Sequence, residues 1–144
     1  MNTRSTAICL ALAAWANSAG AQPSPASETW TPVSRNAQSI TGRVTLLPTQ
    51  IVFQNGTVLP LTPGVQMLFR PDKKGKVVVD LYKVTQPANP VLENGKTLCQ
   101  GKSVAYLLVW KSEKIGPKVD PRSMNVFSGT KFSTGSPDDC GRFV

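Results

Sequence analysis

Apolar and polar residues alternate with a period of two along much of the chain after residue 39. This alternation is typical of strands that bury one face and expose the other. Glycines and prolines cut the apolar runs to between five and nine residues, which leaves no stretch long enough for a capped helix. The pattern therefore predicts eight strands, over residues 39–46, 50–54, 57–61, 65–70, 77–84, 103–110, 124–127 and 141–144.

Two short polar segments predict the turns of β-hairpins. Asn55-Gly56 separates two apolar runs, and both residues tolerate the positive φ that a type I′ turn requires. The charged segment from Pro71 to Lys76 separates the next two runs in the same way. We therefore expect two antiparallel hairpins in the first half of the folded region.

The segment over residues 103–110 is the most apolar one after residue 21, because both of its alternating sets of side chains are apolar. A strand of this kind is covered on both faces, so we expect it at the centre of the core. The run over residues 77–84 differs, since Asp80 interrupts one of its faces. We expect Val77, Val79 and Leu81 to face the core and Asp80 to face solvent.

About eight short strands at this spacing predict an all-β fold, in the form of a small antiparallel barrel with a β-sandwich as the alternative. Closure into a barrel would remove the exposed edges of the sheet. Residues 39–144 make up this single predicted β domain. Residues 22–38 are rich in Pro and Ser, and we expect a flexible segment there.

The first 21 residues have the three-part pattern of a cleaved signal peptide. Arg4 gives the basic start, residues 8–16 form a short apolar run, and small residues end the segment. We expect cleavage between Ala21 and Gln22. The apolar run is well short of the ~20 residues that span a bilayer, so we expect a periplasmic or secreted protein without a transmembrane span.

Removal of the predicted signal peptide changes the length and charge of the chain. The chain has 144 residues and a formal charge of +8; without its first 21 residues it would keep 123 residues and a charge of +7, because Arg4 leaves. The chain has no histidine, which removes the commonest general base and every imidazole ligand for a metal. We therefore expect neither a metal nor a cofactor.

The cysteines predict one disulfide. Cys9 lies within the signal, so Cys99 and Cys140 remain as a single pair. In an oxidising compartment an even pair is typical of a disulfide. A metal site on the two thiolates would lack the further soft ligands that it needs.

The clearest functional signal is a set of basic residues in two predicted loops at strand ends. If both loops open at the same end of the fold, they create a positive rim that attracts anions. The candidate residues for binding an anion or a partner are Lys73, Lys74 and Lys76 in the first loop and Lys111, Lys114 and Lys118 in the second. No residue is assigned as catalytic, although Asp80 would serve as an acid if its face were covered.

These features predict an exported, non-enzymatic binding or inhibitor-like protein of the bacterial cell envelope, with basic loops on a rigid β scaffold. Its partner would be an envelope protein or an anionic envelope polymer; nucleic acid is not expected, because no aromatic stacking platform is visible. The oligomeric state stays open. Length, export and one disulfide are similar to the small periplasmic lysozyme inhibitors, but their Ser-Gly-Ala-Arg-Tyr-like loop is absent, so this likeness concerns architecture alone.

Two other functions remain as alternatives. A small carboxylate-dependent hydrolase would need a second carboxylate at a defined separation from Asp80. A carrier for a small apolar ligand would need a hollow barrel. Both depend on a concave site that the sequence does not reveal.

Overall fold

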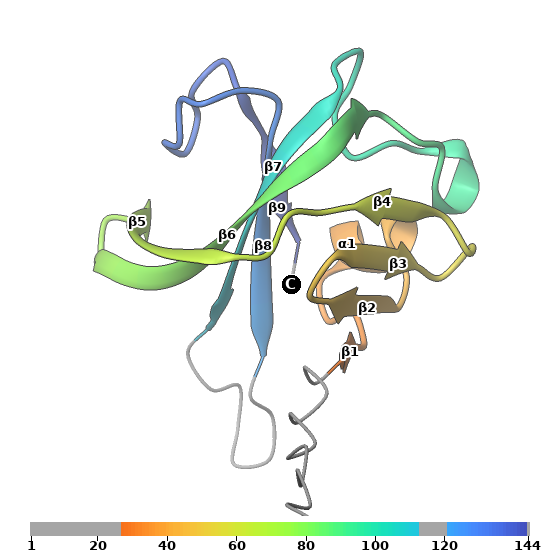
Figure 1. The fold of residues 1–144 in the computed structure, drawn as a ribbon, viewed down its shortest axis with the longest axis horizontal. Coiled ribbons are helices and arrows are strands. Elements are labelled where there is room, and N and C mark those ends of the chain that lie inside the picture. Colours follow the sequence, from red (N-terminus) through yellow and green to blue (C-terminus); the bar gives the residue numbers. More distant parts are fainter. Residues whose placement is uncertain (1–26, 113–120, 144) are drawn as a thin grey trace, which may run out of the picture.

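The computed structural model describes residues 27–112 and 121–143. Within these residues the chain forms nine strands, one α-helix and one short 3-10 helix (Figure 1). The strands are β1 (Glu28–Trp30), β2 (Val44–Leu47), β3 (Gln50–Phe53), β4 (Val58–Pro60), β5 (Val65–Asp72), β6 (Gly75–Ala88), β7 (Val104–Lys111), β8 (Arg122–Phe127) and β9 (Asp139–Phe143), and the helices are α1 (Arg35–Ile40) and η1 (Glu93–Gly95). The predicted signal peptide and its cleavage site lie outside the described residues.

Two antiparallel sheets make up the fold, one with the order β1-β2-β3-β4 and the other with the order β5-β6-β7-β8-β9. They meet at one corner, where a single bridge joins Leu61 to Val84 and the Thr62 N–H donates to the Lys83 carbonyl (2.9 Å). The all-β class is therefore confirmed.

The predicted barrel is wrong, and the β-sandwich alternative describes the fold. Among the described residues, no ladder joins β1 to β9 at the side opposite the corner. Trp30 of β1 and Phe143 of β9 line one pocket there, which lies where the two edge strands stay unpaired. We call this open side the seam.

The first core lies between the two sheets. Alternate residues of β2, β3 and β4 point inward, as the period of two predicts, and meet one face of β7, β8 and β9. Its members on these strands include Leu46, Ile51, Phe53, Leu59, Leu107, Val109, Met124, Val126 and Phe143.

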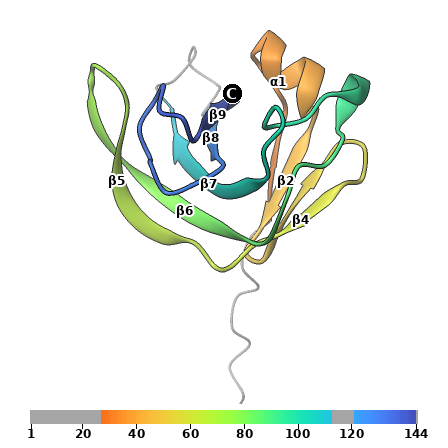
Figure 2. The same ribbon diagram turned by 90° about the horizontal axis from the view of Figure 1, so that it is seen from above.

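A second core covers the opposite face of the five-stranded sheet. Phe69, Val79, Leu108, Trp110 and Phe127 are buried there, and Val77 and Leu81 pack against them. Figure 2 shows the connection between β8 and β9 lying inside the curve that β5 and β6 make. The central strand β7 thus contributes to both cores, which confirms its predicted burial on two faces.

Two aspartates hold this connection over the second core. The Asp138 carboxylate accepts the N–H of Lys131 (3.0 Å), and the Asp139 carboxylate accepts the N–H of Gly135 (2.7 Å) and the amide of Asn125 (3.2 Å). The connection thereby presents Phe132 edge-on to Tyr106 and Phe127, at ring-centroid distances of 5.1 and 5.4 Å. Because these hydrogen bonds satisfy backbone donors of the connection, the polar connection keeps a fixed position over the second core.

The segment before β2 is more ordered than its composition predicts. Glu28–Trp30 pairs with β2, and Arg35–Ile40 is helical, so the expected flexibility of residues 22–38 does not hold for these parts. Ser34 caps the helix, because its hydroxyl accepts the Ala37 N–H (3.1 Å). The helix also replaces the start of the strand predicted over residues 39–46.

The two Asn-Gly pairs adopt different turn conformations. β3 and β4 do form the predicted hairpin around Asn55-Gly56, but only Gly56 has a positive φ (85°), so the turn is not type I′. Its three-residue connection puts a single residue in the left-handed region, which glycine adopts without strain. Asn94 and Gly95 instead both have positive φ (56° and 68°) and reverse the chain between β6 and β7.

The predicted disulfide is confirmed. Cys99, in the connection between β6 and β7, is bonded to Cys140 of β9, with a Cα–Cα distance of 4.9 Å. Asn89 fixes the Cys99 backbone, because its side chain accepts the Cys99 N–H (3.1 Å) and donates to the Cys99 carbonyl. The bond thus attaches a long connection to the last strand.

Within the described residues, no helix is long and apolar enough to cross a membrane.

Loss of the disulfide should destabilise this domain strongly. The bond spans a sequence separation of 41 residues. Closing a loop of about that length lowers the entropy of the unfolded chain, which raises its free energy by about 4 kcal/mol at 25 °C. The double variant Cys99→Ser/Cys140→Ser should therefore melt at least about 10 °C lower in a thermal denaturation followed by circular dichroism. Wild-type protein treated with a reductant is the control and should melt with the variant; an unchanged melting temperature contradicts the stabilising role.

Candidate functional site

The predicted basic residues lie at one end of the five-stranded sheet. Lys73 and Lys74 are in the turn between β5 and β6, Lys76 begins β6, and Lys111 ends β7; all four are exposed. β6 and β7 are antiparallel, with Asp80 opposite Val109, so the start of β6 and the end of β7 lie side by side. The other two candidates, Lys114 and Lys118, lie outside the described residues.

Exposed aliphatic side chains lie beside these cations. Leu68 of β5 is paired with Val78 of β6, and the two are 61% and 58% exposed. Arg70 follows on β5, and the alternation along both strands puts it on the same face as Leu68, Lys76 and Val78. We call this surface the basic sheet face; it comprises Leu68, Arg70, Lys76, Val78 and Lys111.

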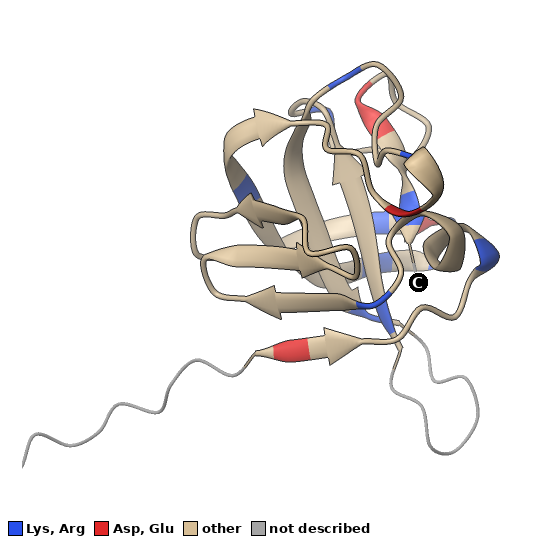
Figure 3. Ribbon diagram, turned by 90° about the vertical axis from the view of Figure 1, so that its right-hand side faces the viewer, with Lys and Arg blue, Asp and Glu red and all other residues tan. Residues whose placement is uncertain are grey.

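The basic sheet face is exposed because the smaller sheet covers only part of the larger one. The four-stranded sheet reaches β6 at Val84, and no described residue of β5 belongs to the first core. In Figure 3, β2, β3 and β4 are tan along their lengths, and these strands contain no Lys, Arg, Asp or Glu. Within the smaller sheet, charge is therefore confined to Glu28 of the edge strand β1.

A second feature is a cavity that reaches from the corner, where Gly64 lines it, to the seam side, where Glu28 and Arg122 line it. It has a volume of about 200 Å³, and Asp80, Tyr82, Glu28 and Arg122 line it. Gly64 also lines it and lies so close to the Tyr82 ring that a Cβ at this position would be 2.9 Å from the ring carbons. We call it the corner cavity. Asp80 is half-buried here, whereas the strand pattern predicts a solvent-facing side chain.

Glu28 and Arg122 connect the two sheets beside this cavity. Arg122 of β8 donates to the Glu28 carboxylate of β1 (Nη2–Oε1, 2.5 Å), and the Trp30 indole N–H donates to its other oxygen (3.3 Å). Both oxygens of Glu28 therefore have partners. Burial raises the pKa of the Tyr82 hydroxyl, the negative charges of Asp80 and Glu28 raise it further, and Arg122 lowers it.

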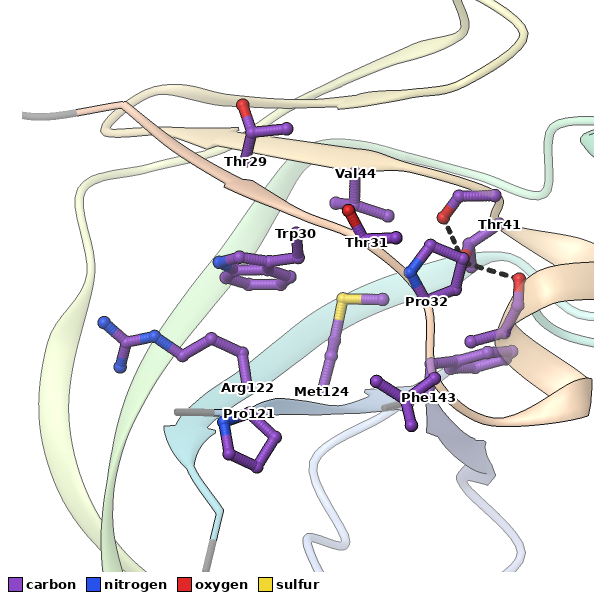
Figure 4. Close-up of a pocket in the computed structure, with 13 residues that line it drawn as sticks. Thr29, Trp30, Thr31, Pro32, Thr41, Val44, Pro121, Arg122, Met124 and Phe143 are labelled. Carbon is purple, nitrogen blue, oxygen red and sulfur yellow. Dashed lines mark hydrogen bonds between the residues drawn. The ribbon is translucent and has the colours of Figure 1, made fainter. Parts of the chain in front are cut away.

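A third feature is a pocket of about 210 Å³ at the seam, drawn in Figure 4. Trp30 comes from β1, Met124 and Arg122 from β8, and Phe143 from β9, so the pocket joins both sheets. Its other lining residues are Thr29, Thr31, Pro32, Val33, Ala37, Thr41, Gly42, Val44 and Pro121. We call it the seam pocket.

Sequence reasoning missed Glu28, Trp30 and Arg122 as site residues. Glu28 and Trp30 lie in a Pro- and Ser-rich region that predicts flexibility, and Arg122 follows a segment without alternation. The one available signal was Trp30 itself, because a large aromatic residue is unusual in a disordered segment. Pairing with β2 gives this tryptophan a fixed position.

The raised pKa of Tyr82 predicts a specific loss of stability at high pH. Below its ordinary pKa of 10.0, the hydroxyl is protonated in both the folded and the unfolded chain. As the pH rises from 10.0 through the higher pKa of the folded state, the unfolded chain loses this proton first, which favours unfolding. The free energy of unfolding of Tyr82→Phe should therefore fall less than that of the wild type above pH 10.

Urea denaturation between pH 7 and pH 11 measures this difference. Tyr106→Phe is the matched control for the loss of a tyrosine hydroxyl elsewhere on the sheet. If the stability difference between wild type and Tyr82→Phe is the same at pH 8 and pH 11, the coupling of Tyr82 to the corner cavity is wrong.

No protein-family model, curated protein or solved structure matches this chain. The function must therefore be argued from the basic sheet face, the corner cavity and the seam pocket.

Proposed function

We propose that this chain is an exported, non-enzymatic binding protein of the cell envelope that binds an acidic protein through the basic sheet face. The observation that carries the proposal is the exposed pair of Leu68 and Val78 with Arg70, Lys76 and Lys111 around it. The predicted signal peptide and the disulfide support an oxidising compartment.

The aliphatic pair gives this surface the composition of a protein interface. Interfaces commonly have an apolar centre that loses its water and a polar rim that stays hydrated. Leu68 and Val78 are 61% and 58% exposed, so a partner that covers both gains about 2–4 kcal/mol of hydrophobic free energy. A purely ionic partner such as a polyanion would leave this contribution unused.

The cations around the pair select for a partner of opposite charge. Exposed ion pairs contribute little affinity each, but a one-sided cluster accelerates association with an acidic surface and repels a basic one. The whole chain is also basic, with 16 Lys and Arg against 8 Asp and Glu. We therefore expect the partner to be a protein with an acidic patch around an apolar contact.

The scaffold holds this surface in place before binding. The reverse face of β5 and β6 is anchored in the second core through Phe69 and Val79. Phe69 packs against Trp110 and Phe127 with ring-centroid distances of 5.7 and 6.0 Å. A rigid surface loses little conformational entropy on binding, which suits a non-enzymatic binder.

A carboxylate-dependent hydrolase is the second candidate, because Glu28 and Asp80 line the same corner cavity. Glycoside hydrolysis needs one carboxyl group as an acid and another as a nucleophile or base. Both oxygens of Glu28 accept hydrogen bonds from Arg122 and Trp30, so neither is free for these roles. Binding is therefore the better-supported function.

Neutralising the basic sheet face should weaken capture of the partner. Immobilised protein without residues 1–21 is incubated with envelope extract, and bound proteins are quantified by mass spectrometry. The triple variant Arg70→Gln/Lys76→Gln/Lys111→Gln should retain at least about 10-fold less of the acidic partner, because three cations of the interface are lost. The matched control is Arg35→Gln/Lys83→Gln/Lys131→Gln, which removes the same charge from other exposed positions. Equal losses in both triple variants contradict the proposal.

A second variant separates a protein partner from an anionic polymer. Leu68→Ser/Val78→Ser keeps every charge and removes the aliphatic pair, so it should also lose the partner about 10-fold or more. Capture that survives this variant, and that also survives protease treatment of the extract, identifies an anionic polymer and overturns the protein partner.

A further inference from the structure

We infer that the seam pocket binds a small aromatic carboxylate, because Arg122 lies at an apolar pocket walled by Trp30, Met124 and Phe143. This binding site is separate from the basic sheet face, which lies on β5, the start of β6 and the end of β7. It is also distinct from the interior of a hollow barrel, since the pocket exists where the barrel fails to close.

The size of the pocket limits the ligand to one ring with a short substituent. Its volume is about 210 Å³. An apolar protein cavity of about 150 Å³ is large enough to hold benzene. The additional space fits a carboxymethyl group or a group of similar size.

The apolar wall is built before any ligand arrives. Met124 and Phe143 belong to the first core and are 2% and 4% exposed, so their positions are fixed by packing. Trp30 is held by its indole bond to Glu28 and by the pairing of β1 with β2. A flat indole and a polarizable thioether on neighbouring sides favour a planar aromatic ring between them.

Arg122 sets the charge of the ligand. Its guanidinium has five N–H donors in a planar fork, and the contact with Glu28 uses one of them (2.5 Å). The side chain is 21% exposed and lines the seam pocket. Carboxylates are the small anions that match this fork best. Glu28, which is 42% exposed, competes with a ligand carboxylate for the same guanidinium.

Titration with three matched probes tests this site. Phenylacetate, phenylacetamide and 2-phenylethylamine share one ring and differ in charge. Protein without residues 1–21 contains Trp30 and Trp110 but not Trp15, so its two indole N–H resonances report on the pocket and on the second core. Phenylacetate should shift the Trp30 resonance and leave that of Trp110 in place, with a dissociation constant of about 1 mM or tighter. It should bind about 10-fold more tightly than the amide, and the amine should bind least.

Variants then assign the charge preference to the two paired side chains. Arg122→Met should weaken phenylacetate about 10-fold, to the affinity of the amide, whereas Lys131→Met, which removes an exposed charge elsewhere, should have no effect. Glu28→Gln should tighten phenylacetate about threefold, because the competing carboxylate is removed. This mild variant and the wild-type probe series decide the question even if Arg122→Met is unstable.

Two results would overturn the inference. If the Trp30 resonance does not move at 20 mM phenylacetate, a level about 20-fold above the expected dissociation constant, the pocket does not take such ligands. If the three probes bind equally, the pocket accepts a ring without reading its charge, and the assignment of Arg122 is wrong. Neither result bears on the basic sheet face, because the capture experiment uses different residues.

Discussion

The architecture depends on the way the two sheets meet: they join at one corner and stay apart on the opposite side. At the corner, the bridge between Leu61 and Val84 passes the chain from the smaller sheet to the larger one. At the seam, the edge strands β1 and β9 are not paired, and Trp30 and Phe143 line a pocket there. Pairing there would have produced a closed barrel; its absence gives a sandwich with an apolar pocket along one side. The ion pair between Glu28 and Arg122 connects the sheets across this side without closing it.

The long strand β6 turns this incomplete contact into two separate surfaces. Its second half meets the smaller sheet at Val84, whereas its first half extends past that sheet and pairs only with β5 and β7. In this region, one face of β5 and β6 is apolar and is buried in the second core. The other face carries Leu68, Val78 and cations. Without the packing of the second core, nothing would hold β5 and the first half of β6 rigid. The surface on β5 and β6 and the pocket at the seam are thus consequences of the same arrangement, although they share no residue.

Local features of the fold could be predicted from the sequence, and long-range ones could not. Residues 103–110 show their central position directly, because both faces of the strand are apolar, and two remaining cysteines allow only one pairing. The closure of the sheets depends instead on side chains such as Glu28 and Arg122, which are 94 residues apart and have no shared pattern. The Asn-Gly pairs show the same limit on a smaller scale. Both sequences allow a type I′ turn, but only in Asn94-Gly95 do both residues have a positive φ. Among the site residues, the exposed lysines could be predicted, because charged residues are common in the loops at strand ends. The aliphatic pair Leu68 and Val78 could not, because it depends on the register of β5 and β6.

The most direct test of the proposed binding function is hydrogen–deuterium exchange of the protein alone and in complex with its captured partner. Exchange of backbone amides reports which strands lose solvent contact or gain stability on binding. If the basic sheet face is the binding surface, amides in residues 65–80 and at the end of β7 become protected, and those of β2, β3 and β4 keep their exchange rates. Protection confined to β2, β3 and β4, or no change in residues 65–80, would contradict this account.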